Sequence, residues 1–156
     1  MMHHPFNLKK WQHLLATGFG SGLSPKAPGT AGTLAALPLV LALSVLPLWL
    51  SALIIVFICG LGVYVSDVTS RDLGVDDHGG IVIDEVAGFA ITMWALPADG
   101  WILLAGFLLF RFLDIVKPWP VRVFDQHVLG GLGVMADDIV AGLLACGLLH
   151  GVLLAL

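Results

Sequence analysis

The stretch LAALPLVLALSVLPLWLSALIIVFICGLGVYVS, residues 34–66, contains no Asp, Glu, Lys, Arg or His. A single helix of that length would reach about 50 Å, whereas the hydrocarbon core of a bilayer is about 30 Å thick. We therefore predict two membrane-spanning helices, residues 33–46 and 48–66, separated by a break at Pro47. The alternative, a helical hairpin buried in a soluble domain, is less favoured because 156 residues provide too small a core.

The rest of the chain extends this apolar pattern. Hydrophobic residues make up 58% of the sequence and charged residues 12%, about half the charged share usual in soluble proteins. Further apolar segments lie at residues 81–96, 101–116 and 139–156. Residues 6–16 suit a short helix in the membrane surface, and residues 18–33 are too rich in Gly and Pro for regular structure. We predict an all-α, polytopic membrane helix bundle with four or five transmembrane helices plus an N-terminal interfacial helix, forming one domain over residues 1–156.

The basic residues indicate how this bundle is oriented. With the amino terminus in the cytoplasm, all seven fall on the cytoplasmic side, as the positive-inside rule requires. They are Lys9, Lys10, Lys26, Arg71, Arg111, Lys117 and Arg122. The net charge of −4 and the lack of a basic cluster argue against nucleic acid as a partner. No cleavable signal peptide is visible, so the first span is expected to direct insertion. The oligomeric state is not indicated.

The same topology brings five acidic residues to the cytoplasmic ends of the spans. Asp84 and Glu85 open the third span, Asp114 closes the fourth, and Asp137 and Asp138 open the fifth. Carboxylates that meet in a partly dehydrated setting repel one another unless a cation neutralises them. Oxygen ligands without a Cys or His cluster favour a hard cation, magnesium before manganese or calcium. The alternative, that the acids only complement helix amino termini, fails for Asp114 at a carboxyl end.

Two basic side chains and a Gly-Thr segment are candidates for phosphate binding. Arg111, Asp114 and Lys117 are spaced to lie along one broad face of a helix, so Arg111 can pair with Asp114 or with a substrate phosphate. Lys117 can also simply extend to the membrane interface. Free backbone N–H groups before a helix form phosphate nests, and Thr30, Gly32 and Thr33 occupy such a segment. An ordinary loop with an N-cap is the alternative there.

Four blocks of sequence together resemble the phosphatidylglycerophosphatase A family. They are SPKAPGTAGT at 24–33, DHGGIVIDE at 77–85, FRFLDIVKPWP at 110–120 and DDIVAG at 137–142. The resemblance covers nearly the whole chain and implies magnesium-dependent hydrolysis of phosphatidylglycerophosphate to phosphatidylglycerol and phosphate, in phospholipid biosynthesis at the bacterial inner membrane. Asp84, Glu85, Asp114, Asp137 and Asp138 match the family's acidic positions, and Arg111 and Lys117 match its basic ones. His78 stands where many relatives have Pro, and it is a candidate proton shuttle.

The mechanism we expect is metal-assisted attack by water on the phosphate. Asp84, Glu85, Asp114 and Asp138, with Arg111 and Lys117, are the expected catalytic residues, and all five acids are expected metal ligands. Phosphate contacts are expected from Thr30, Gly32, Thr33, Arg111 and Lys117. Whether one or two metals bind, and which carboxylate is the general base, stays open. An ion or proton transporter is the rival function, but a transport path needs ionisable groups through the bilayer. A membrane scaffold would leave the acids unexplained.

Overall fold

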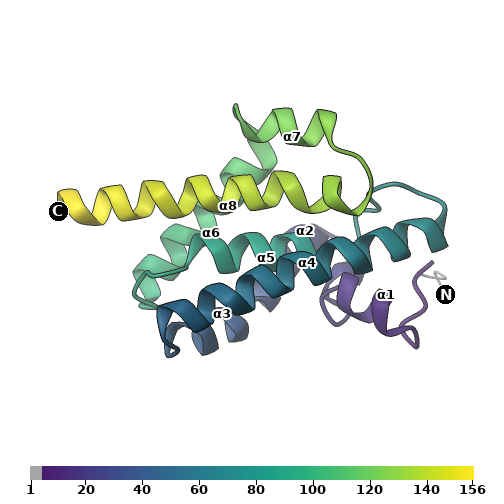
Figure 1. The fold of residues 1–156 in the computed structure, drawn as a ribbon, viewed down its shortest axis with the longest axis horizontal. Helices are drawn as coiled ribbons and strands as arrows, with labels where there is room; N and C mark the ends of the chain where they lie inside the picture. The colour runs from purple at the N-terminus through teal and green to yellow at the C-terminus, as the bar shows by residue number, and fades with distance from the viewer. Residues whose placement is uncertain (1–4) are drawn as a thin grey trace.

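The computed structural model describes residues 5–156, and every regular element in that range is a helix (Figure 1). In chain order the elements are α1 (Trp11–Ala16), the short 3-10 helix η1 (Ser21–Leu23), α2 (Pro28–Ala35), α3 (Leu37–Ser44), α4 (Leu48–Leu73), α5 (Ile83–Thr92), α6 (Gly100–Val116), α7 (Val121–His127) and α8 (Gly130–Ala155). The all-helical prediction is therefore confirmed over the described residues.

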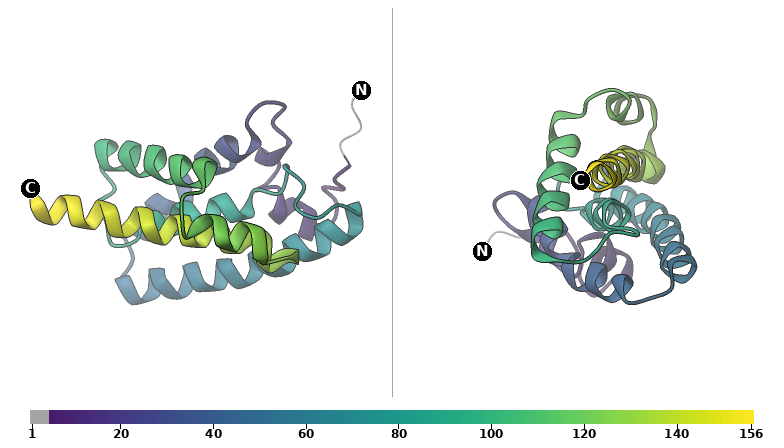
Figure 2. Two further views of the ribbon diagram at one scale, coloured as in Figure 1. Left: turned by 90° about the horizontal axis from the view of Figure 1, so that it is seen from above. Right: turned by 90° about the vertical axis from the view of Figure 1, so that its left-hand side faces the viewer.

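Helix α5 forms the centre of the bundle. Eight of its ten residues are buried, and α2, α4, α6 and α8 pack around it (Figure 2, right). The closest approach is to α8, where a Cβ atom at Gly142 would lie only 2.5 Å from the carbonyl oxygen of Gly88. Both positions therefore require glycine, because a side chain at either would push the two helices apart.

Helices α4 and α8 are the long elements, with 26 residues and a length of about 39 Å each. Both are long and apolar enough to cross a membrane. In the most apolar 18-residue stretch of each helix, only 22% (α4) and 28% (α8) is buried inside the protein. The two helices cross where Gly131 meets α4, since a Cβ there would lie 2.1 Å from the carbonyl oxygen of Val63. The core helix of a soluble protein is mostly buried, whereas α4 and α8 are mostly exposed.

Three expected boundaries are wrong. Helix α2 begins at Pro28, inside the segment expected to be irregular, because proline suits the first turn of a helix. Helix α4 continues through residues 67–73 and ends at Leu73, because the following Gly74 adopts the left-handed conformation that stops a helix. Helix α8 begins at Gly130 rather than near Asp137. In addition, the helical part of the expected third span has only ten residues, too few to cross a bilayer alone.

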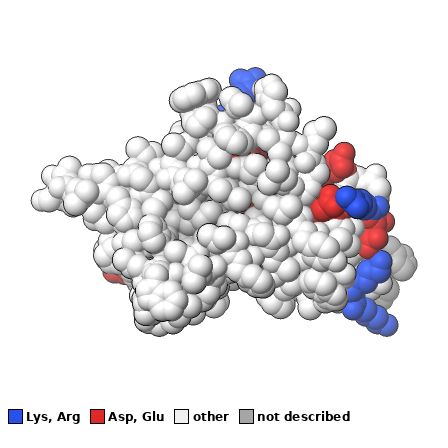
Figure 3. Space-filling model, in the orientation of Figure 1, with Lys and Arg blue, Asp and Glu red and all other residues white. Residues whose placement is uncertain are grey.

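The charged side chains gather at one end of the molecule. Figure 3 shows most acidic and basic groups at the end where α1 and the carboxyl end of α4 lie, beside a largely uncharged surface. Asp72 of α4 there accepts hydrogen bonds from Lys10 Nζ at 2.8 Å and His13 Nε2 at 2.9 Å. These contacts fasten α1 to α4. The expected helix at residues 6–16 is shorter than predicted, since α1 begins only at Trp11.

Candidate metal centre

Five carboxylates from three helices meet beside the amino end of α5. Asp84 and Glu85 lie in the first turn of α5, as predicted, and Asp114 lies in the last turn of α6. Asp137 and Asp138 lie about two turns into α8, so the expectation that they open the last helix is wrong. Attraction to a helix amino terminus therefore explains neither of these two, because that effect is confined to the first turn.

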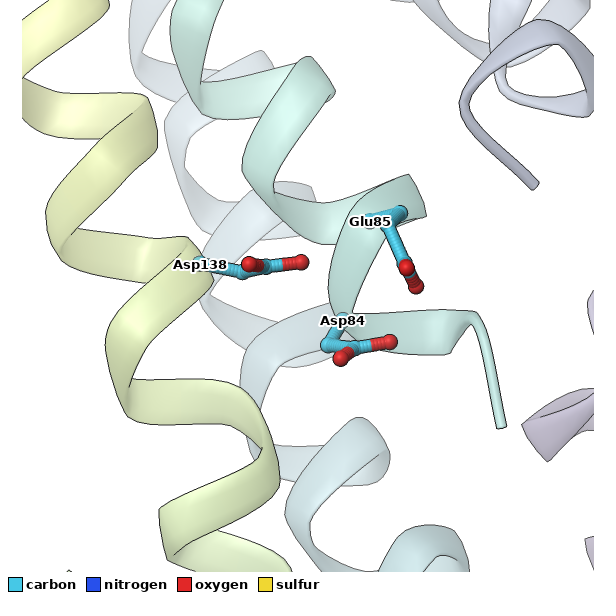
Figure 4. Close-up of side chains that lie close together, drawn as sticks. All are labelled: Asp84, Glu85 and Asp138. Carbon is cyan, nitrogen blue, oxygen red and sulfur yellow. The ribbon is translucent and has the colours of Figure 1, made fainter. Parts of the chain in front are cut away.

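The five acids form two groups of three that share one residue. The first, the Asp84 triad, consists of Asp84, Glu85 and Asp138, and the second, the Asp114 triad, consists of Asp114, Asp137 and Asp138. Within each triad, one oxygen atom per residue lies within 4.8 Å of the others. Figure 4 shows Asp84 and Glu85 on α5 with Asp138 reaching toward them from α8. The predicted convergence of the acids is thus found.

The Asp84 triad carries oxygen atoms that no residue in the described part of the chain satisfies. Asp84 and Asp138 are 9% and 2% exposed. Asp84 Oδ1, Glu85 Oε2 and Asp138 Oδ2 are buried without a hydrogen-bond partner among the described residues. Leaving such groups unpaired is costly, and a bound cation would remove that cost. Carboxylate oxygens alone are the ligands of a hard divalent cation, so the donor set fits the predicted metal.

The Asp114 triad, in contrast, has cationic partners within the chain. Arg111 donates from Nη1 to Asp114 and lies 3.8 Å from Glu85 Oε1, while its Nε is buried without a partner in residues 5–156. Lys117 Nζ donates to Asp137 at 2.7 Å and also pairs with Asp125 of α7. Burial opposes the charge on Lys117, but the two carboxylates raise its pKa above the usual range, so the ammonium stays charged.

Lys117 reaches Asp137 from an unexpected position. It follows the last residue of α6 and adopts a left-handed conformation, with φ of 50°. The expectation that it shares one helix face with Arg111 and Asp114 is therefore wrong. Left-handed backbone is unfavourable for residues other than glycine, and its occurrence often marks functional sites. Ala27 before α2 and Asp77 before α5 share this conformation, with φ of 47° and 51°.

The first turn of α2 lies against the centre. A Cβ at Gly29 would be 2.4 Å from Glu85 Oε1 and 3.1 Å from both terminal nitrogens of Arg111. Because the helix begins at Pro28, only Gly29 and Thr30 of the predicted phosphate nest belong to this turn. Gly32 instead packs on Val82, and the buried Thr33 hydroxyl donates to the Gly29 carbonyl at 2.9 Å. Their predicted contact with phosphate is not favoured by these positions.

Three contacts near the centre escaped prediction from the sequence. Asp125 is a second partner of Lys117, Gly29 makes the close approach described above, and Asp77 lies within electrostatic reach of Lys117, Asp114 and Asp125. No spacing rule connects these positions, because they come from separate elements. The local signals were the sequence block 24–33, which contains Gly29, and the block 77–85, which joins Asp77 to the acidic pair of α5.

Comparisons with known proteins agree on a family. A family model described as Phosphatidylglycerophosphatase A matches residues 14–153. Phosphatidylglycerophosphatase A of Escherichia coli K12 is 52% identical over 139 residues, which cover 88% of this chain and 81% of the relative. The protein of that name from Haemophilus influenzae is 47% identical, covering 85% and 83%. A Bacteroides thetaiotaomicron protein, named provisionally as a phosphatidylinositol-3-phosphatase, is 42% identical, covering 83% and 85%. No solved structure shows significant similarity.

Proposed function

The chain belongs to the phosphatidylglycerophosphatase A family, and on that premise we propose that it hydrolyses phosphatidylglycerophosphate to phosphatidylglycerol and phosphate. The observation that carries this proposal is the pair of acidic triads joined at Asp138, with buried oxygens that lack partners. All three relatives are named for removing a phosphate from a lipid headgroup. A metal-assisted phosphatase is the enzyme class that such a carboxylate centre supports.

We propose magnesium as the cofactor. Asp84, Glu85 and Asp138 would hold one ion, and Asp114, Asp137 and Asp138 provide ligands for a second. Five carboxylates face only two cationic side chains, Arg111 and Lys117, which leaves a deficit of three positive charges if all are ionised. When bound, the metal supplies Lewis-acid stabilisation of the phosphoryl oxygens and lowers the pKa of water.

The side chains around the metal have separate roles in this proposal. Arg111 has an Nε–H without a partner among the described residues and contacts two acids, so its guanidinium can donate to phosphate oxygens as the reaction proceeds. Lys117 holds Asp137 in place, and the backbone N–H of Asp138 fixes the same carboxylate at 3.0 Å. Gly29 and Thr30 offer backbone N–H groups from the first turn of α2.

We also propose that the chain spans the bacterial inner membrane with its charged end in the cytoplasm. Helices α4, α6 and α8 and the joined α2 and α3 (Pro28–Ser44) would cross, while α5 lies enclosed among them. The low burial of α4 and α8 supports a lipid environment. Trp101, 81% exposed at the uncharged end, suits the opposite membrane interface. Trp11, half-exposed on α1, suits the cytoplasmic one.

The orientation is testable with single cysteines in a chain from which Cys59 and Cys146 have been removed. Asp99→Cys should react with a membrane-impermeant thiol reagent on intact cells, and Asp76→Cys should react only after permeabilisation. Asp76 is preferable to Asp72, because Asp72 binds Lys10 and His13. Labelling of position 76 but not 99 on intact cells would reverse the proposed orientation.

The activity is testable with purified protein and synthetic phosphatidylglycerophosphate in detergent. Phosphate release should need a divalent cation, stop with excess chelator and return with magnesium. A transporter or scaffold would release no phosphate under any of these conditions. Full turnover in excess chelator would refute the metal-dependent mechanism while leaving the substrate assignment intact.

A further inference from the structure

An open cavity of 600 Å³ lies next to the metal centre and has no role in the mechanism above. Its walls come from three separate segments: residues 5–6, residues 22–25 with Pro28, and residues 78–80. We call it the loop cavity. The segments are locked together, since a Cβ at Gly22 would lie 2.1 Å from the carbonyl oxygen of Gly80. The cavity is therefore formed in advance of binding, as ligand sites commonly are.

His78 is the titratable side chain that lines the loop cavity. Its Nδ1 accepts a hydrogen bond from the backbone N–H of Gly80 at 3.0 Å, so the proton of the neutral ring is on Nε2. The ring of Phe6 packs edge-on against it, with centroids 4.9 Å apart. These two contacts fix the imidazole, and Nε2–H is a donor without a protein partner among residues 5–156.

The segments that line the loop cavity are continuous in sequence with residues of the metal centre and with a basic residue. Pro28 in its wall precedes Gly29, which contacts Glu85 and Arg111. Gly80 precedes Asp84 by only four residues, at most about 14 Å. Lys26 is exposed and lies in the sequence between the lining residues Pro25 and Pro28, in a loop held by Ser24 Oγ donating to the Lys26 carbonyl at 2.8 Å.

We propose that the loop cavity binds the glycerol phosphodiester part of the lipid headgroup, with Nε2–H of His78 as a hydrogen-bond donor and Lys26 as the counter-charge. The inference rests on the proposed function, because it needs a phosphate monoester at the metal centre. In the substrate, the glycerol phosphodiester links that monoester to the acyl chains. This polar linker must therefore occupy space next to the metal centre. A fixed donor and a cation beside that space suit a hydroxyl and a diester phosphate. His78 is thus a specificity-determining residue.

The test compares two inhibitors of phosphatidylglycerophosphate hydrolysis by the purified protein. Phosphatidylglycerol carries the glycerol phosphodiester without the monoester, whereas inorganic phosphate represents the monoester alone. His78→Asn keeps an acceptor for the Gly80 N–H and removes the far donor. We expect this variant to raise both the inhibition constant of phosphatidylglycerol and the KM for phosphatidylglycerophosphate about three- to tenfold. The inhibition constant of inorganic phosphate should stay unchanged. His78→Gln keeps a donor near the Nε2 position and should stay within about twofold of the original protein.

Two further variants complete the experiment. Lys26→Gln removes the charge of an exposed side chain. It should raise the inhibition constant of phosphatidylglycerol about threefold. His127→Asn, on the exposed α7 away from the cavity, should change neither constant. Equal effects on both inhibitors, or a loss in His78→Gln but not in His78→Asn, would overturn the proposal and leave His78 as a loop support. An original protein that releases no phosphate would instead refute the proposed function.

Discussion

The two acidic triads contain the same number of carboxylates but differ in how the chain neutralises them. In the Asp114 triad, Asp114 pairs with Arg111 and Asp137 with Lys117. In the Asp84 triad, each residue has a buried oxygen without a partner. The difference indicates that the chain neutralises the Asp114 triad more fully, because the Asp84 triad has only the 3.8 Å contact of Arg111 with Glu85. A cation is therefore expected to bind more tightly at the Asp84 triad.

Removing the residue common to both triads should have the largest effect. Asp138→Asn removes a charge from each, so we expect kcat/KM for phosphatidylglycerophosphate to fall roughly a thousandfold. Asp67→Asn, which breaks only the ion pair with Arg71 near the same end, is the matched control and should keep its activity. If Asp138→Asn retains a tenth of the original kcat/KM, the activity does not depend on Asp138 as a shared member of the two triads.

The cations of the Asp114 triad should differ from each other. Arg111→Lys keeps the charge but loses the forked donor geometry, so we expect a loss of roughly a hundredfold in turnover. Lys117→Arg should cost only about threefold, because an ammonium acts as a point charge that a longer side chain can replace. Turnover and melting temperature should be measured on the same preparations. An active but less stable Arg111→Lys protein would mean that Arg111 only supports Asp114.

A magnesium titration compares the triads directly. In Asp84→Asn the magnesium concentration for half-maximal phosphate release should rise about thirtyfold, because a ligand of the unsatisfied triad is lost. In Asp137→Asn it should rise only about threefold, since Lys117 already offsets that carboxylate. Equal shifts in the two variants would contradict the proposed division between the triads.

The thermal stability of the protein should also respond to the metal. Magnesium at a hundred times its dissociation constant should stabilise the folded state by about 2.7 kcal/mol, equivalent to a rise in melting temperature of about 5–10 °C. Potassium at equal ionic strength is the control. At the same magnesium concentration the rise should shrink to about a third in Asp84→Asn, whose site binds about thirtyfold more weakly, and should largely persist in Asp137→Asn. A rise that survives in full in both variants would place the stabilising ion elsewhere.

The sequence predicted which acids meet but not how each is satisfied. Successive helices that alternate in direction bring Asp84, Asp114 and Asp138 to one end, so their convergence follows from topology. The start of α8 could not be predicted, because Gly131 resembles a loop residue and its role emerges only from contact with Val63. The pairing of Lys117 with Asp125 and Asp137 depends on a left-handed backbone that no local pattern indicates.

The close contact of Gly88 with Gly142 has a consequence for the ionic radius that the centre accepts. Each glycine lies four residues, about one helical turn, beyond a carboxylate of the Asp84 triad, Asp84 on α5 and Asp138 on α8. The backbone contact thus acts as a spacer that keeps the two carboxylates at a short separation. Magnesium binds oxygen at about 2.0–2.1 Å and calcium at about 2.3–2.6 Å. A methyl group in Gly142→Ala would widen the gap and shift the preferred activator from magnesium toward calcium.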